Sequence, residues 1–174
     1  MPTFILGKDA KIYQGAAGGD LGTLTEMDNV KDVTLNLEAG EADVTTRANS
    51  GWRATAPTLR ECTCEFEMVW KPGDAGFDAI KTAFLAGTTI ELAVLDQARE
   101  TVGAQGPKGS FSITSFSRNE ALEEAITVSV TAKLAVFVEW REAALAYPVS
   151  PLRRHRSPTL NSVLTEMIIP SENR

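Results

Sequence analysis

Hydrophobic and polar residues alternate at every second position over several stretches of the chain. The clearest stretch is 61–70, where the apolar positions are Cys62, Cys64, Phe66, Met68 and Trp70. This alternation is typical of a β-strand with one buried face. Residues 3–17 indicate an extended arm or first strand, and the alternation returns at residues 30–38, 88–96, 109–118 and 125–138. The pattern predicts a mainly β fold with one helix (α+β in the broad sense): an antiparallel β-sandwich or barrel with a flanking helix.

The helix is predicted from a change of period after residue 73. The sequence Lys-Pro-Gly at 71–73 ends a strand, and Asp74 follows at the place expected for a helix N-cap. Four apolar residues then recur at helical spacing, namely Phe77, Ile80, Phe84 and Leu85. Gly87 marks the end of the helix. We expect this apolar stripe to pack on the sheet.

A long polar segment, residues 40–59, separates the strand at 30–38 from the strand at 61–70. It is too long for a hairpin turn and carries no set of residues suited to catalysis. The alternation therefore predicts a strand, a long loop and a second strand, with the loop binding other protein. Among the three tryptophans, Trp70 suits the core, Trp52 in this loop suits an interface, and Trp140 suits either.

The last part of the chain differs from the rest. Residues 143–174 contain four prolines and the basic cluster Arg153, Arg154, His155 and Arg156. We predict two parts, a β domain at 1–142 and a Pro- and Arg-containing tail at 143–174. A mobile solvated tail is the favoured interpretation of the basic cluster, and docking on a partner subunit, phosphates or lipid headgroups is the alternative.

Charge and composition exclude several functions. The net charge is −6, and because residues 143–174 hold four arginines and two glutamates, the main domain carries −8. An acidic domain repels nucleic-acid phosphates, which disfavours sequence-specific DNA binding but suits a surface along which DNA slides. No apolar run is long enough for a membrane span, and no signal peptide is expected. Two cysteines fit a reducing cytoplasm, with Cys62 and Cys64 as reduced core residues.

Few residues are suited to chemistry. His155 is the only histidine, so the sequence offers few residues for a catalytic triad or for a metal site built from histidines. Glu120, Glu123 and Glu124 form the one carboxylate group considered for acid–base work, and a solvated acidic rim explains them better. Glu65 and Glu67 face away from the apolar side of their strand, toward solvent or a pore. We expect no enzyme activity, no metal and no cofactor.

Several motifs together resemble one protein family. They are DVTT at 43–46, the aspartate-capped helix after a tryptophan-ended strand, and SFSRNEALEEA at 115–125. In this order, over residues 3–138, they resemble the major tail tube proteins of bacteriophages and prophages. Ala121 departs from the proline expected there, and the extension at 143–174 has no counterpart in the family.

The resemblance implies a structural subunit that works by assembly. It implies six copies per ring, rings stacked into a tube, double-stranded DNA passing through the lumen, and partners among other tail proteins. It places the protein in the virion tail, after assembly in the host bacterial cytoplasm. It makes residues 40–59 the loop that contacts neighbouring subunits, with the interface residues Asp43, Val44, Thr45, Thr46, Arg47, Trp52 and Arg53.

Two other functions stay open at this point. A ring subunit of a secretion-system or contractile-injection tube is hard to distinguish by sequence from a phage tail subunit. A β-sandwich module that binds carbohydrate or protein through Trp52 and Arg53 is the second alternative. An enzyme resting on Glu123 and its neighbours ranks third.

Overall fold

The fold is one antiparallel sheet of seven strands with a single α-helix. A computed structural model describes residues 4–142 of the 174, and all statements below concern that range. The strand order is β2-β1-β5-β6-β7-β4-β3, and every neighbouring pair is antiparallel. The strands are β1 Lys11–Ala16, β2 Thr25–Glu26, β3 Val30–Asp43, β4 Thr55–Val69, β5 Thr89–Leu95, β6 Gln105–Asn119 and β7 Thr127–Glu142. The helix is α1, Ala75–Ala86, and three single-turn 3₁₀ helices lie at Gly7–Asp9, Leu21–Thr23 and Arg47–Asn49. The prediction of a mainly β fold with one helix is confirmed.

The sheet bends around its core, so that strands from both halves bury their side chains in one cluster. Side chains of β4 and β7 meet those of β1 and β5 there, and α1 closes the cluster with Phe77 and Ile80. Trp70 packs edge-on against Phe77, with ring centroids 5.0 Å apart. The expectation that Trp70 belongs to the core is therefore confirmed. Cys62 and Cys64 are buried free thiols, also as predicted.

The helix begins and ends as its sequence indicates, but its apolar stripe is narrower than predicted. The Asp74 side chain accepts a hydrogen bond from the Phe77 backbone N–H at 3.1 Å, and Gly87 ends the helix in the left-handed conformation. Phe77 and Ile80 are buried, whereas Leu85 is 75% exposed. The prediction that Leu85 packs on the sheet is wrong, because Ala83 takes the buried position in the last turn.

The second face of β1 and β5 carries a smaller cluster and a buried ion pair. Segment 16–24 lies over this face, with Leu24 packed beside Tyr13 and Leu95. The carboxylate of Glu91 is fully buried there, 3.1 Å from the Lys108 ammonium nitrogen. Glu91 also accepts hydrogen bonds from the Ser110 hydroxyl at 2.7 Å and the Gly18 backbone N–H at 3.0 Å.

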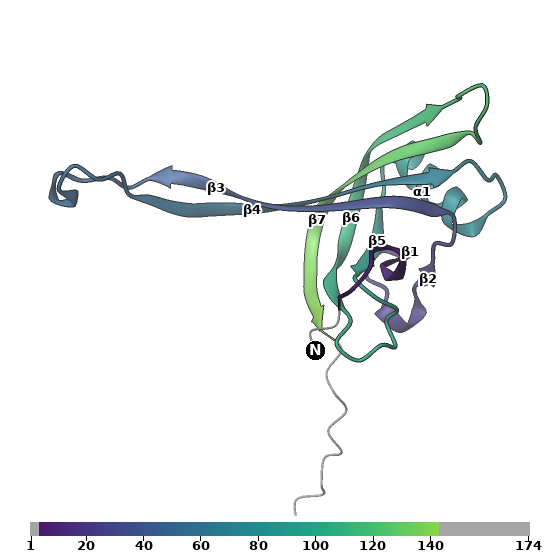
Figure 1. The fold of residues 1–174 in the computed structure, drawn as a ribbon, viewed down its shortest axis with the longest axis horizontal. Coiled ribbons are helices and arrows are strands. Elements are labelled where there is room, and N and C mark those ends of the chain that lie inside the picture. The colour runs from purple at the N-terminus through teal and green to yellow at the C-terminus, as the bar shows by residue number, and fades with distance from the viewer. Residues whose placement is uncertain (1–3, 143–174) are drawn as a thin grey trace, which may run out of the picture.

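The most prominent feature is an arm that projects from the body (Figure 1). It is formed by the outer parts of β3 and β4, whose pairing continues from Val30 and Met68 to Asp43 and Thr55. The prediction that residues 40–59 form a long loop is wrong in part, since both strands extend into it and only residues 44–54 connect them. Two other boundaries also differ: β6 begins at Gln105, before the predicted strand at 109–118, and β7 continues to Glu142, beyond the predicted end at 138.

Candidate subunit interface

The seven residues predicted at the interface all lie at the tip of the arm. The β4–β7 pairing stops at Thr63 and Lys133, so beyond this point β4 pairs with β3 alone. A ribbon of two strands has no second layer to bury its side chains, and both outer edges keep unpaired backbone groups. The arm is thus an exposed element that gains burial only from another molecule.

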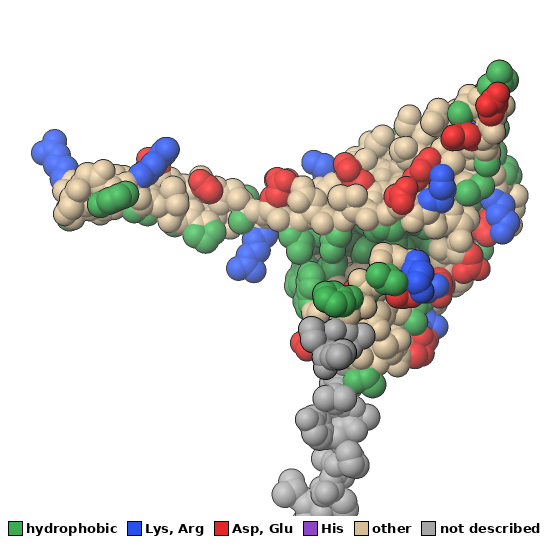
Figure 2. All heavy atoms as spheres, viewed as in Figure 1, with side chains coloured by type: hydrophobic (Ala, Val, Ile, Leu, Met, Phe, Trp, Pro, Cys, Tyr) green, Lys and Arg blue, Asp and Glu red, His purple; other side chains and the backbone are tan. Residues whose placement is uncertain are grey.

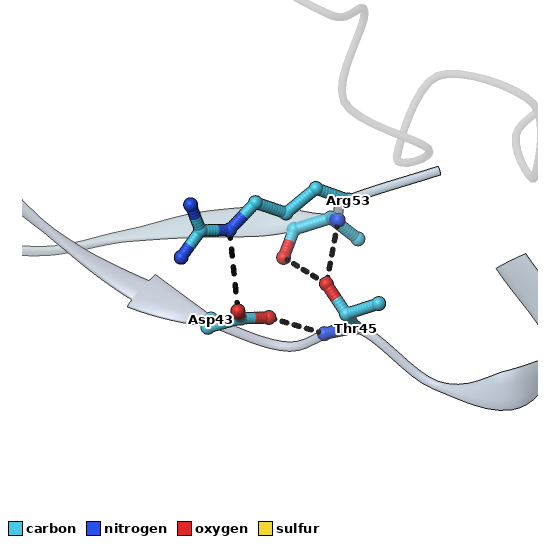
Figure 3. A network of polar contacts seen from close by, with 4 residues as sticks. Asp43, Thr45 and Arg53 are labelled. Atoms are coloured by element: carbon cyan, nitrogen blue, oxygen red, sulfur yellow. Dashed lines mark hydrogen bonds and ion pairs between the residues drawn. The ribbon is translucent and has the colours of Figure 1, made fainter. Parts of the chain in front are cut away.

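A polar network holds the tip in shape (Figure 3). The Asp43 carboxylate accepts hydrogen bonds from the Thr45 backbone N–H at 2.9 Å and from the Arg53 Nε at 3.2 Å. The Thr45 hydroxyl accepts from the Ala54 backbone N–H at 2.9 Å, across the tip. Hydrogen bonding by Thr45, and to a smaller extent by Arg53, lowers the pKa of Asp43. The DVTT motif thereby ties the end of β3 to the start of β4.

The end of the tip is a tight turn. The Thr46 hydroxyl bonds the Asn49 side-chain oxygen at 2.9 Å, and the Trp52 backbone N–H bonds the Asn49 carbonyl at 2.9 Å. Ser50 and Gly51 both adopt positive φ, at 50° and 84°. Glycine accepts this conformation without strain, whereas serine does so at some cost.

The tip also presents apolar and basic side chains to solvent. Trp52 is 80% exposed and Val44 is 49% exposed. Arg47 starts the 3₁₀ turn and is exposed as well. The structure thus brings Asp43, Thr45 and Arg53 into one network, while Trp52, Val44 and Arg47 lie on its surface. Their role at an interface stays a prediction.

A polar face covers the side of β3, β4 and β7 that lies opposite the core. A cleft of about 290 Å³ on this face is lined by Thr34, Asn36, Glu38, Glu61, Thr63, Glu65, Thr131 and Lys133. Glu38 and Glu61 are directly opposite each other on neighbouring strands. Like charges in this position repel. Glu65 is exposed and points away from the buried side chains, as the sequence indicates.

Among residues 4–142, the other candidate residues are an exposed acidic turn and two buried thiols. Glu120, Glu123 and Glu124 are exposed at the β6–β7 turn, where Glu120 pairs with Arg118. Burial raises the pKa of the Cys64 thiol to about 12. Within residues 4–142, no group of three or more His, Cys, Asp or Glu side chains could hold a metal ion. Among the helices of the same range, none is long and apolar enough to cross a membrane. His155 and its arginine neighbours, like the rest of the predicted tail at 143–174, lie outside the described residues.

Sequence reasoning missed a second exposed apolar surface, at the base of the arm. Leu37, Phe137 and Trp140 are each about half exposed, at 55%, 57% and 47%. Of these three residues, the sequence pattern indicated only Trp140 as an anchor for a core or an interface. The signal available was the apolar run Val136, Phe137 and Val138, which breaks the alternation near the end of the last strand.

Solved structures with the same fold include a particle tail, a tail tube and a baseplate. The tail of an empty gene transfer agent particle, computed with helical refinement in C6 symmetry, aligns with a TM-score of 0.61 and 21% identity, over 78% of this chain and 98% of that chain. The SPP1 tail tube, solved by solid-state NMR and cryo-EM, aligns with a TM-score of 0.61 and 20% identity, over 81% of this chain and 80% of that chain. The baseplate of the anti-feeding prophage aligns with a TM-score of 0.54 and 6% identity, over 83% of this chain and 98% of that chain. The chain thus has the tail tube fold.

The family follows from the sequence itself. The family model described as phage tail tube protein matches residues 6–138. This range is most of the chain, so the protein belongs to the phage tail tube protein family. No curated protein gives a significant match.

Proposed function

We propose that this tail tube protein works as a ring-forming subunit, six copies to a ring, with rings stacked into a tube. The arm is the observation that carries this proposal, because its tip is exposed, is held together by the hydrogen bonds of Asp43, and is apolar at Trp52. The C6 symmetry printed for the gene transfer agent tail supports the number six. Edge strand β3 supports ring closure, since its outer backbone groups are unpaired along the sheet edge and pair readily with another chain. Head-to-tail contacts of this kind close into rings.

The tube conducts double-stranded DNA in this proposal, and the polar face of β3, β4 and β7 lines the lumen. Three glutamates and one lysine line the cleft on that face among hydroxyl and amide groups, and no aromatic side chain lines the cleft. Excess negative charge prevents phosphates from being retained through counterion release, so the duplex slips past. The protein acts within the virion tail after assembly in the bacterial cytoplasm, alongside other tail proteins, and its role is structural instead of catalytic.

Arm shortening tests the assembly proposal. Residues 45–53 are replaced with Asn-Gly, which suits a two-residue hairpin turn and leaves Val44 opposite Ala54. We expect the wild type to form rings or rods in negative-stain images and the shortened chain to stay monomeric with an unchanged circular dichroism spectrum. Undiminished rods from the shortened chain would refute the role of the arm.

The lumen assignment has its own test. Glu38, Glu61 and Glu65 are replaced together by lysine, and assembled tubes are incubated with short duplex DNA. We expect wild-type tubes to leave DNA free at physiological salt and the variant tubes to retain it in a salt-dependent way. Equal retention by both tubes would show that this face does not meet DNA. Tight retention by wild-type tubes would contradict the conduit itself. The injection-tube alternative rests on the likeness in fold to the anti-feeding prophage baseplate.

A further inference from the structure

An apolar groove opens at the base of the arm, where two hairpins fork. The β4–β7 pairing ends at Thr63 and Lys133, while β6 and β7 stay paired to Gln105 and Glu142. A groove of about 440 Å³ lies between the diverging strands. Its apolar lining consists of Leu37, Ala39, Cys62, Leu134, Phe137 and Trp140. Figure 2 shows hydrophobic side chains gathered in the angle beneath the base of the arm.

The groove continues the core face of the sheet past the point where other elements cover it. Cys62 is buried and Leu134 packs against the core, whereas Leu37, Phe137 and Trp140 are about half exposed. The β6–β7 pairing contains register shifts near Lys108 and Ser110. Each shift adds one residue to β7, so Leu134, Phe137 and Trp140 lie on the same face although they are three residues apart. An exposed apolar surface of this kind marks an interaction site.

The same hairpin has a complementary knob at its other end. Residues 120–126 form the β6–β7 turn, in which Leu122 is fully exposed. Glu123 and Glu124 follow it and are also exposed. The turn therefore presents one large apolar side chain beside two carboxylates without a basic partner among residues 4–142. The groove supplies the opposite charge, because Arg60 is exposed along its wall. Glu38 and Glu61 also border the groove, but their cross-strand pair alternates with the pairs Leu37–Cys62 and Ala39–Arg60, so their side chains project toward the opposite, polar face.

We propose that the groove receives the β6–β7 knob of a second copy of this chain, with Leu122 inserted between Leu37, Phe137 and Trp140. Charge complementarity selects this occupant, since Arg60 then faces Glu123 and Glu124. The arm tip fits less well, because its own charges, Arg47 and Arg53, match the sign of Arg60. The inference rests on the proposed function and identifies a contact between subunits that does not involve the arm tip.

Distance along the hairpin requires the two partners to belong to different copies. The knob precedes Thr127, and the groove lining on β7 extends over residues 134–140. At about 3.3 Å per residue, the two sites on one chain are separated by roughly 25 Å or more along a continuous strand. Leu122 therefore cannot enter its own groove. A knob at one end and a socket at the other end make a head-to-tail contact, which repeats from subunit to subunit.

Photocrosslinking tests the contact directly. Leu122 is replaced by p-benzoylphenylalanine in the full chain, and assembled protein is irradiated and digested with trypsin. We expect crosslinks to the peptide 134–141, released by cleavage after Lys133 and Arg141, to Cys62 in the peptide 61–81, or to Leu37 or Ala39 in the peptide 32–47. Lys71 is not cleaved, because Pro72 follows it. In a mixture of isotopically heavy and light chains, these crosslinks are expected to join heavy to light. Crosslinks from assembled protein to the arm tip, to residues 143–174 or to any other region overturn the proposal.

Charge exchange provides a second test. We expect the Arg60→Glu variant to need a concentration about tenfold higher or more for assembly. The double variant Glu123→Lys, Glu124→Lys should show the same increase. The variant that combines all three substitutions should assemble at a concentration close to that of the wild type. Phe137→Ala is expected to act in the same direction, whereas the control Leu85→Ala, on the exposed side of α1, leaves assembly unchanged. Assembly without knob crosslinks or charge rescue refutes the groove assignment alone. A full chain that never assembles refutes the proposed function as well.

Discussion

The buried pair of Glu91 and Lys108 gives a quantitative test of the fold. Both side chains are at least nine-tenths buried, and their charged atoms are 3.1 Å apart. Replacing Lys108 with methionine keeps most of the side-chain volume but leaves the Glu91 carboxylate without its counter-charge. Removing one partner of a buried pair costs about 3–5 kcal/mol. Ser110 and Gly18 still donate hydrogen bonds to Glu91, so we expect the lower end, about 3 kcal/mol.

Urea unfolding followed by tryptophan fluorescence measures this change, at a concentration at which the wild type is monomeric. A loss of about 3 kcal/mol corresponds to a fall in the melting temperature of roughly 6–12 °C for a chain of this size. Lys133→Met is the matched control, because Lys133 is exposed, and we expect its effect to stay within about 0.5 kcal/mol. Equal stability of the Lys108→Met variant and the wild type would refute the idea that Lys108 stabilises the buried Glu91 carboxylate.

The same pair makes stability depend on pH. Burial alone would raise the pKa of Glu91, but hydrogen bonds from Ser110 and Gly18 and the attraction of Lys108 outweigh burial and lower it. A group whose pKa is lower in the folded state stabilises the fold above its unfolded pKa and loses this contribution as pH falls through the folded value. We therefore expect the free energy of unfolding to fall as the pH drops below about 4.5, and to fall less in a Glu91→Gln variant.

Three further predictions concern the core and the helix. Because Cys62 and Cys64 are buried and burial raises the pKa of both thiols, Ellman's reagent is expected to react with neither until the chain is unfolded in urea, and fast reaction of the native protein would contradict the described core. Asp74→Ala removes the helix cap and should cost about 1 kcal/mol in urea unfolding, so a neutral effect would count against the cap. Phe77→Ala should cost about 3–5 kcal/mol whereas Leu85→Ala should cost less than about 0.5, and similar costs for the two would refute the narrow apolar stripe.

The strands of the body could be predicted from sequence because one of their faces is buried. Phe66 and Met68 alternate with exposed or half-exposed neighbours, and this alternation is what a sheet with one buried face produces. The arm gave no such signal. Its outer strands pack against nothing, so no position there is required to be apolar. Pro57 and Gly40 even indicate breaks, yet Pro57 fits β4 where that strand has a single neighbour, because no hydrogen bond is needed on its other side.

The candidate interface was predictable only in part. The position of the tip residues followed from the family resemblance, and the structure adds the Asp43–Thr45–Arg53 network, which no periodicity indicates. The groove was missed because the register shifts in β6 and β7 change which residues share a face. Strict alternation predicts Val136 as a buried residue, and it is 58% exposed. Such shifts depend on the pairing of two strands distant in sequence, and a single strand read alone does not reveal them.

Native mass spectrometry of the purified protein tests the central claim most directly. The claim is that copies of this chain associate head to tail into closed rings through the arm and the sheet edge. We expect a dominant species with six times the mass of the 18.8-kDa chain, together with its multiples, and monomer alone when residues 45–53 are replaced with Asn-Gly. Only monomer from the wild-type chain at every concentration tested, or the same rings from both chains, would contradict the account.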